Sequence, residues 1–348
     1  MSGFPVHPDE VTPAWLSDTF GAHVRSVSWE PIGTGQVGDS VRFHIQGEGV
    51  PATLAGKFPA ADVTSRGTAA MFGLYRKEVE FYRQVAPLLD VRVPQTFAAE
   101  ASEDGACFVL LFEDLGPARQ GDQVAGCTLD EAKAAIAQAA AIHAPSWGRK
   151  DILEAGWIQP TEDWGAKVGA MYPQAQALFA ERYADTLEPE YMAVCTELAE
   201  QAAAYFRRDP DHQCLVHGDF RLDNMLFDIR GDSEPIAILD WQTVTIGKAM
   251  TDIGYFLGCG IGQLGLDHEE ELLDLYLAEM AARGVRLTRA DIAEDYRLGI
   301  LHGVSTAVFS AAFVERTERG DANFLSMARG ACALALKHDS IGALKEKG

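Results

Sequence analysis

The spacing of apolar residues divides the chain into a first part that predicts strands and a second part that predicts helices. Residues 24–58 alternate between apolar and polar positions, as in SVRFHIQ, where Val41, Phe43 and Ile45 are every second residue. This period is that of a β-strand with one buried face. A helix is predicted over roughly residues 68–86, after which VRVPQTFAAE and ACFVLLFEDLG restore the character of strands.

From about Leu129 onward most of the chain is rich in Ala and Leu and predicts helices. Residues 213–246 interrupt them with two strand-like runs, NMLFDI and PIAILDW, on either side of the turn IRGDSEP. The sequence contains no internal repeat and no low-complexity linker. The layout therefore predicts an α+β fold with a small β-rich lobe, residues 1–115, followed by a larger α-rich lobe, residues 116–348.

The composition is that of an ordinary globular protein. With 348 residues, 47% of them apolar, the chain can bury a full core. Its longest apolar stretch, ACFVLLF, is too short to cross a bilayer, and its first residues lack the features of a signal peptide, so a cytoplasmic protein is expected. Six cysteines are scattered without a CxxC pair, which favours free thiols over disulfides or zinc.

The formal charge of −22 is shared along the chain rather than gathered in one run. So acidic a molecule repels nucleic acid and anionic membranes, and neither is expected as a partner. The charge would favour a cationic small molecule, yet acidity spread over a whole surface usually serves solubility. Charge therefore leaves the chemistry of a small-molecule ligand open, and the oligomeric state is open as well.

A glycine-rich loop, GTGQVG, has the spacing G-x-G-x-x-G with Gly33, Gly35 and Gly38 as its glycines. In a dinucleotide-binding fold such glycines open a helix. Here they precede DSVRFHIQ, which has the period of a strand. A hairpin of this kind is how kinase-type folds cover the phosphates of ATP. A hairpin that is only flexible explains the loop nearly as well.

Lys57 ends the apolar run TLAGKF, and Glu78 lies on the apolar face of the helix predicted next. A carboxylate on a buried face needs a cationic partner, and Lys57 is the nearest candidate in the pattern. In kinase-type enzymes such a pair positions the α- and β-phosphates. An ion pair with a purely structural role is an equally good interpretation.

The stretch LVHGDFRLDNMLF, residues 215–227, places polar groups between two short apolar runs. Asp219 precedes Asn224 by five positions, which in the kinase catalytic loop puts a base near the attacking hydroxyl and an amide oxygen on magnesium. Asp240 closes the later apolar run IAILD and is a candidate second metal ligand. Oxygen ligands of this kind suit Mg²⁺.

These motifs carry a resemblance to a known family. HGDFRLDN followed by ILDWQ resembles the aminoglycoside phosphotransferase and choline kinase group, including its ecdysteroid-kinase-like branch, and KEVEFYRQ, LLFEDL and AAIHAPSW resemble it too. The resemblance extends from Gly33 to Phe256. It implies a two-lobed fold like that of protein kinases, with the nucleotide bound by residues 1–115 and catalysis in residues 116–348.

The resemblance also implies roles for individual residues. Asp219 corresponds to the catalytic base or hydroxyl-orienting group, Asn224 and Asp240 to magnesium ligands, and Lys57 with Glu78 to the pair that positions the phosphates.

The same resemblance makes residues 112–115, FEDL, the hinge whose backbone meets adenine, with Glu113 and Leu115 as its contacts. It assigns structural roles to two other residues. His217 would hydrogen-bond the backbone that presents the aspartate of ILDWQ, and Asp252 would brace the catalytic loop.

Arg221 departs from the group's pattern. It stands two positions after Asp219, where protein kinases carry a lysine and antibiotic kinases often have a histidine. We expect its guanidinium to contact the γ-phosphate and neutralise charge in the transition state. The alternative is a surface ion pair with Asp223 or Asp228.

The sequence thus predicts an ATP- and Mg²⁺-dependent phosphotransferase that moves the γ-phosphoryl group to a hydroxyl of a small molecule. The acceptor, whether aminoglycoside, choline-like, sterol-like or other, is open, as is the choice between ATP and GTP. Aromatic candidates for lining the acceptor pocket are Trp157, Trp164, Trp241 and Tyr255. The alternative functions are a nucleotide-binding pseudokinase that acts through a protein partner and a dehydrogenase, which the strand after GTGQVG argues against.

Overall fold

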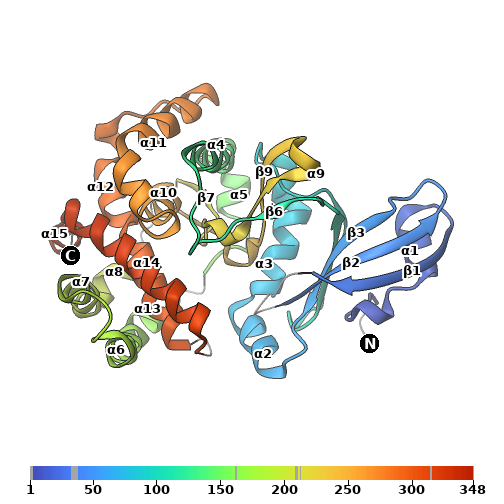
Figure 1. Ribbon diagram of the computed structural model, residues 1–348, viewed down its shortest axis with the longest axis horizontal. Coiled ribbons are helices and arrows are strands. Elements are labelled where there is room, and N and C mark those ends of the chain that lie inside the picture. Colours follow the sequence, from blue (N-terminus) through green and yellow to red (C-terminus); the bar gives the residue numbers. More distant parts are fainter. Residues whose placement is uncertain are drawn as a thin grey trace. The chain divides into compact units, whose positions relative to one another are not determined.

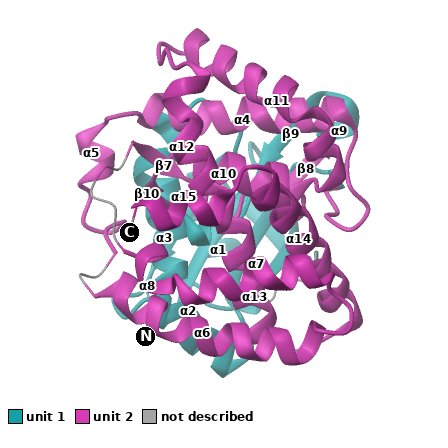
Figure 2. Ribbon diagram, turned by 90° about the vertical axis from the view of Figure 1, so that its left-hand side faces the viewer, with its two compact units in different colours: residues 1–119, 228–244 teal, residues 120–227, 245–348 magenta. Residues whose placement is uncertain are grey.

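The computed structural model describes residues 3–32, 38–160, 163–207, 211, 213–313 and 316–347. Contacts divide the chain into two compact units, coloured teal and magenta in Figure 2. Unit 1 comprises Met1–Arg119 with Asp228–Val244, and unit 2 comprises Gln120–Phe227 with Thr245–Gly348. Gly33 and Gly35, two of the three glycines predicted to cover phosphates, lie outside the described residues.

Unit 1 contains a five-stranded antiparallel sheet in the order β1-β2-β3-β5-β4, of which β1, β2 and β3 are labelled in Figure 1. Its strands are β1 (Val24–Pro31), β2 (Gly38–Gly47), β3 (Thr53–Pro59), β4 (Thr96–Ala101) and β5 (Phe108–Glu113). The predicted strands are confirmed, although β4 begins only after VRVPQ because Pro94 has no N–H for the sheet. The buried core on one face of the sheet comprises Val11, Leu16, Val24, Val41, Phe43, Ile45, Leu54, Phe58, Val109 and Leu111.

The helix predicted over residues 68–86 is two helices in the structure. The helical elements of unit 1 before the sheet's last strands are η1 (Pro8–Glu10), α1 (Pro13–Phe20), α2 (Val63–Phe72), α3 (Leu74–Glu80), a π-turn (Phe81–Val85) and a 3₁₀ turn (Ala86–Leu88). Gly73 separates α2 from α3, and its φ of 65° is the left-handed conformation that favours glycine. Glu78 lies after this break, on the buried side of α3.

The segment 228–244 belongs to unit 1 although it lies far along the chain. It contains a short turn (Ile229–Asp232), β9 (Glu234–Ile238) and a 3₁₀ turn (Trp241–Thr243). Arg92 fixes it, because Nε of Arg92 donates to Glu234 at 2.5 Å and its carbonyl accepts from Ile238 N at 2.9 Å. The predicted lobes 1–115 and 116–348 put this segment in the second lobe. That division stays a prediction, and the compact units differ from it here because sequence order cannot show a late segment folding back.

Unit 2 is mainly helical, as the Ala- and Leu-rich pattern predicts. Its helices are α4 (Leu129–Ser146), α5 (Lys150–Leu153), α6 (Trp164–Tyr183), α7 (Pro189–Glu200), α8 (Ala202–Tyr205), α10 (Met250–Tyr255), α11 (Gln263–Ala282), α12 (Arg289–Gly299), α13 (Leu301–Phe313), α14 (Glu318–Lys337) and α15 (Ser340–Lys347). β7 (Cys214–Val216) pairs antiparallel with β10 (Thr245–Gly247), and β8 spans Met225–Asp228. Across the described residues, no helix combines the length and apolar character needed to span a membrane.

Two glycines let α10 and α12 approach closely in unit 2. A Cβ on Gly299 would lie 2.1 Å from the carbonyl oxygen of Met250, and one on Gly254 would lie 2.6 Å from the backbone nitrogen of Ile300. No side chain fits at either position without moving a helix. The approach matters for the site, because α10 carries Asp252 and is directly preceded by β10.

Candidate active site

Lys57 and Glu78 form the ion pair that the sequence predicts. Nζ of Lys57, at the end of β3, lies 2.8 Å from each carboxylate oxygen of Glu78 on α3. The Glu78 side chain is only 1% exposed and that of Lys57 is 14% exposed. The backbone N–H of Trp241 also donates to Glu78 at 3.3 Å. The carboxylate is therefore fully enclosed and held from two sides.

Asp240 joins this pair from the segment 228–244. Its Oδ1 lies 3.2 Å from Nζ of Lys57, and its side chain is 42% exposed. The residue has a φ of 61°, a left-handed conformation that costs an ordinary residue about 1 kcal/mol or more and persists where the surroundings hold it. The neighbouring Trp241 is buried and stacks on Phe81 with ring centroids 3.7 Å apart, so it belongs to the core of unit 1.

The charges of this triad follow from burial and proximity. Burial lowers the pKa of Lys57, but Asp240 and Glu78 outweigh it and hold that pKa above its ordinary value. Burial raises the pKa of Glu78 above its ordinary value, and the nearby charge of Lys57 offsets only part of that rise. Lys57 thus remains a charged ammonium with two carboxylates beside it, of which only that of Asp240 reaches solvent.

Gly38, the last glycine of GTGQVG, begins β2 and packs beside Lys57. A Cβ on Gly38 would lie 2.9 Å from the carbonyl oxygen of Phe58 and 3.7 Å from Cε of Lys57. In the sheet, Ser40 is directly opposite Lys57. The strand predicted after the glycines is thereby confirmed, because Gly38 opens a strand and not the helix that a dinucleotide-binding turn requires.

Glu113 and Leu115, the predicted hinge contacts, lie at the end of β5 in unit 1. Oε1 of Glu113 accepts from Arg92 at 2.7 Å and from the backbone N–H of Gln95 at 2.8 Å. The Leu115 carbonyl accepts from Arg230 N at 3.2 Å. Within the described ranges, the Leu115 N–H has no acceptor.

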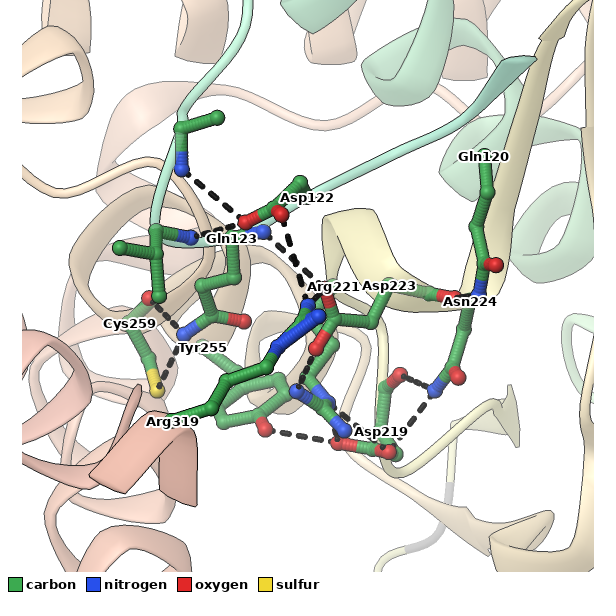
Figure 3. Close-up of polar contacts among 12 residues, drawn as sticks. Gln120, Asp122, Gln123, Asp219, Arg221, Asp223, Asn224, Tyr255, Cys259 and Arg319 are labelled. Atoms are coloured by element: carbon green, nitrogen blue, oxygen red, sulfur yellow. Dashed lines mark hydrogen bonds and ion pairs between the residues drawn. The ribbon is translucent and has the colours of Figure 1, made fainter. Parts of the chain in front are cut away.

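Asp219 lies in unit 2, between β7 and β8, with both carboxylate oxygens engaged (Figure 3). Oδ1 accepts from the Tyr255 hydroxyl at 2.7 Å, and Oδ2 accepts from Nδ2 of Asn224 at 2.8 Å. Nε of Arg221 lies 3.0 Å from Oδ1. Burial alone would raise the pKa of Asp219, but Arg221 and the Tyr255 hydrogen bond outweigh it and bring that pKa below its ordinary value. Asp219 is thus a fixed, ionised carboxylate.

Side chains from two helices hydrogen-bond the backbone directly before Asp219. Asp252, at the start of α10, accepts from the N–H groups of His217 at 2.7 Å and Gly218 at 2.9 Å. The Gly218 carbonyl accepts from Nε2 of His302 on α13 at 2.7 Å. His143 on α4 donates through Nε2 to Asp252 at 3.2 Å, fully buried. These partners hold the loop without touching the side chains of Asp219 and Asn224.

Nδ1 of His217 accepts from the N–H of Asp219 at 3.3 Å. Its predicted hydrogen bond to the backbone that presents Asp240 stays a prediction.

Arg221 is held between two carboxylates in unit 2. Besides Asp219, it contacts Asp223, whose Oδ2 accepts from Nη1 of Arg221 at 2.6 Å. Asp223 also accepts from the N–H of Gln123 at 3.0 Å, and Arg319 lies 3.9 Å away (Figure 3). The ion pair with Asp223 that the sequence offered as an alternative is therefore present. Contact with a phosphate stays a prediction.

Asn224 in unit 2 and Asp240 in unit 1 each offer an oxygen of the kind that Mg²⁺ prefers as a ligand. Asn224 uses its Nδ2 on Asp219, which leaves its Oδ1 without a partner in the described chain. Asp240 has an exposed carboxylate beside Lys57. In the described ranges, no three His, Cys, Asp or Glu side chains gather as a metal cage. Mg²⁺ needs none, because it keeps waters and phosphate oxygens as ligands beside one or two protein groups.

Comparison with known families decides what kind of protein carries these groups. A profile described as the phosphotransferase enzyme family matches residues 67–295, well over half of the chain. The chain belongs to the phosphotransferase enzyme family. The resemblance inferred from HGDFRLDN and ILDWQ is thereby confirmed, while the ecdysteroid-kinase-like branch is not. Family membership supports a phosphotransferase that acts on a small molecule.

Solved structures confirm the α+β, kinase-like fold of this family member. Choline kinase from Cryptosporidium parvum has a TM-score of 0.56 at 11% identity, covering 94% of this chain and 92% of that one. The GDP complex of aminoglycoside 2'-phosphotransferase-IIIa has a TM-score of 0.54 at 17% identity, with 91% and 96% covered. A microcompartment-associated aminopropanol kinase has a TM-score of 0.50 at 18% identity, with 95% and 98% covered. At these identities the likeness shows the fold alone.

Curated relatives match over short stretches only. Acyl-CoA dehydrogenase family member 11 from Homo sapiens is 31% identical over 100 residues, which are 28% of this chain and 13% of that protein. The Gallus gallus protein of the same name is 32% identical over 87 residues, 25% and 11%. The chain thus spans about a tenth of the length of these relatives.

Sequence reasoning missed three side chains that support Asp219. Tyr255 was a candidate for lining an acceptor pocket, but it is fully buried and donates to Asp219. Nothing in the sequence indicates that His143 and His302 support the loop that carries Asp219. His143 stands in the AAIHAPSW motif, whose resemblance to the family gives its helix but not its contact. His302 lies outside every motif, 83 positions after Asp219.

Proposed function

We propose that this protein is an ATP- and Mg²⁺-dependent phosphotransferase that moves the γ-phosphoryl group of ATP to a hydroxyl of a small molecule. The observation that carries the proposal is the enclosed Lys57–Glu78 pair with the exposed Asp240 carboxylate beside it. A buried ammonium fixed by one carboxylate, next to a second that reaches solvent, suits phosphates that arrive with a metal ion. Family membership supports the same class of reaction.

Lys57 would donate to α- and β-phosphate oxygens, with Glu78 fixing its direction. Gly38, Gly33 and Gly35 would supply backbone N–H groups over the phosphates. The hinge 112–115 would meet adenine through the Leu115 N–H and the backbone of Glu113. This assignment favours ATP, and a comparison with GTP tests it.

Asp219 would orient the acceptor hydroxyl and take its proton. The acceptor oxygen forms a bond to the γ-phosphorus while the bond from that phosphorus to the bridging oxygen of ADP breaks, and the hydroxyl proton passes to Asp219. Because its pKa is below the ordinary value, Asp219 is a weak base that accepts the proton late, when the oxygen has become acidic. Tyr255 and Asn224 keep the carboxylate aimed meanwhile.

Asn224 and Asp240 would hold the metal through their oxygens. Bound Mg²⁺ would neutralise charge on the transferring phosphates. Arg221 would direct its guanidinium at the γ-phosphate while it keeps its ion pair with Asp223. Its present contact with Asp219 would have to loosen for that role.

Thermal unfolding with and without Mg·ATP tests the proposal first. Ligand at about a hundred times its Kd stabilises by roughly 2.7 kcal/mol, which raises Tm by a few degrees. The rise should require Mg²⁺ and should disappear in Asp240→Asn. No rise at saturating nucleotide would contradict the proposal.

A screen for ADP release then identifies the acceptor. The screen includes aminoglycosides, choline and amino alcohols, because proteins of similar fold are named as kinases or phosphotransferases of such compounds. It also includes neutral and sterol-like alcohols. An acceptor of the reaction should release ADP with wild type and not with Asp219→Asn.

A further inference from the structure

A left-handed turn in unit 1 lies against the predicted hinge. Asp228, Arg230, Gly231 and Asp232 have φ angles of 55°, 53°, 66° and 69°. Only one of these four is glycine. Each of the others adopts a conformation that is unfavourable for a residue with a side chain. Such a turn persists only where its contacts hold it, so its contacts are informative.

Two residues of the turn, Arg230 and Gly231, contact the hinge and the residues just after it through their backbone N–H groups. We call these two residues the hinge brace. The N–H of Arg230 donates to the Leu115 carbonyl at 3.2 Å, and that of Gly231 donates to the Pro117 carbonyl at 3.1 Å. The left-handed conformation turns these N–H groups toward the hinge. The brace therefore fixes the backbone on both sides of Gly116.

The Arg230 side chain continues the same contact. Its guanidinium pairs with the carboxylate of Glu113, which Arg92 holds from the other side at 2.7 Å. The Glu113 side chain is 14% exposed and that of Arg230 is 45% exposed. Burial raises the pKa of Glu113, but Arg92 and the Gln95 N–H outweigh it, so the carboxyl stays ionised. Two cations thus hold the carboxylate of Glu113, within the hinge.

We infer that Arg230 is a positioning residue for nucleotide binding, which holds the hinge in the conformation that receives the adenine base. The inference rests on the proposed function, because the hinge matters only if a nucleotide binds there. Arg230 touches no nucleotide in this scheme. A hinge already fixed by the brace loses less conformational entropy when the base binds, and that difference appears as affinity.

Arg230→Gly tests the inference without collapsing the turn. Glycine adopts the left-handed conformation freely and keeps the N–H to Leu115. The variant therefore removes the Arg230 side chain, with its contact to Glu113 and its longer one of 3.5 Å to Glu234, and leaves the backbone contact in place. Asp232→Gly is the matched control. It makes the same kind of change in the same turn, and the described residues offer no hydrogen-bond or ion-pair partner to the Asp232 side chain.

Titration of Mg·ATP should give a Kd roughly three- to tenfold weaker for Arg230→Gly, the range expected for a partly exposed ion pair with an enclosed carboxylate. The same factor should appear in KM for ATP, whereas kcat at saturating ATP and KM for the acceptor should not change. Asp232→Gly should bind Mg·ATP as wild type does. Arg230→Lys should recover part of the affinity, because an ammonium restores the charge but not the planar contact.

The outcomes separate the inference from the proposed function. If wild type binds Mg·ATP and Arg230→Gly binds it equally well, the inference is wrong and the proposed function stands. An equal weakening in Asp232→Gly would also overturn it, because the turn rather than Arg230 would be responsible. If wild type binds no nucleotide at all, the proposed function and the inference fall together.

Discussion

At Lys57, an enclosed ion pair with Glu78 lies beside a third charge, Asp240, which reaches solvent. Taking an ammonium and a carboxylate out of water costs several kcal/mol per ion, and close pairing offsets that cost only when both partners are present. Glu78 has no alternative cation in its described surroundings, whereas Asp240 can turn to solvent. The pair is thus a weak source of stability and a strong constraint on geometry.

Lys57→Met should therefore destabilise the protein by about 3–5 kcal/mol, because it strands a buried carboxylate. Lys57→Met combined with Glu78→Leu should recover most of that loss, since two apolar side chains replace the pair. Chemical denaturation measures both. Phosphotransfer should fall on the order of a hundredfold in the single and the double variant alike. Recovery of activity together with stability would show that the pair has no role beyond structure.

At the scale of helices, a buried carboxylate joins three elements of unit 2. Glu269 on α11 accepts from Tyr296 of α12 at 2.7 Å, and it lies 2.5 Å from Nε2 of His338 and 2.6 Å from Nζ of Lys337, at the end of α14. Burial raises the pKa of Glu269, but these hydrogen bonds outweigh it and lower that pKa from 4.5 to about 2.

The direction of the shift fixes the pH dependence. A carboxylate with a depressed pKa contributes stability that is complete above its unfolded value and is lost as pH falls toward the folded value. Wild type should lose this contribution between pH 4.5 and about 2, on the order of 2–3 kcal/mol once screening by solvent is taken into account. Glu269→Gln should be less stable at neutral pH and should show a shallower loss of the free energy of unfolding in that acid range. An acid profile identical to wild type would contradict the assignment.

The contact between α10 and α12 gives a second prediction at this scale. Gly299→Ala places a methyl group 2.1 Å from the Met250 carbonyl, so α10 has to move and Asp252 moves with it. We expect a loss of stability of about 2 kcal/mol or more and a lower kcat from a displaced catalytic loop. The matched control is Gly67→Ala in α2, where a Cβ meets nothing within 4 Å. It should stabilise by about 0.5–1 kcal/mol and leave kcat unchanged.

Across the whole molecule, what could be predicted from sequence depended on how local the cause was. Period-two alternation in SVRFHIQ gave a strand, and the apolar face around Glu78 gave its pairing with Lys57, because both patterns are local. Gly73 breaks a helix whose apolar spacing continues through it, so the pattern alone predicted one helix. The contacts of Tyr255 and His302 with the catalytic loop depend on how distant helices pack, and no local pattern records them. The same is true of residues 228–244, which fold back onto unit 1.

Net charge also acts at the scale of the whole molecule. The formal charge of −22 comes from 51 acidic and 29 basic residues, and like charges held in a compact fold repel one another. Salt shortens the range of that repulsion, to about 10 Å at 0.1 M. Local ion pairs weaken with salt as well, but exposed pairs contribute little each, so the net repulsion should dominate.

We therefore expect Tm to rise by a few degrees when NaCl increases from about 0.02 M to about 0.3 M at neutral pH. The rise should shrink near the isoelectric point of about 4.7, because the net charge that salt screens has then largely gone. That second measurement separates screening from a general effect of salt on apolar burial, which would persist at the isoelectric point. A Tm that falls with salt at neutral pH would show instead that paired charges, such as those around Glu113 and Glu269, outweigh the repulsion among unpaired acidic groups.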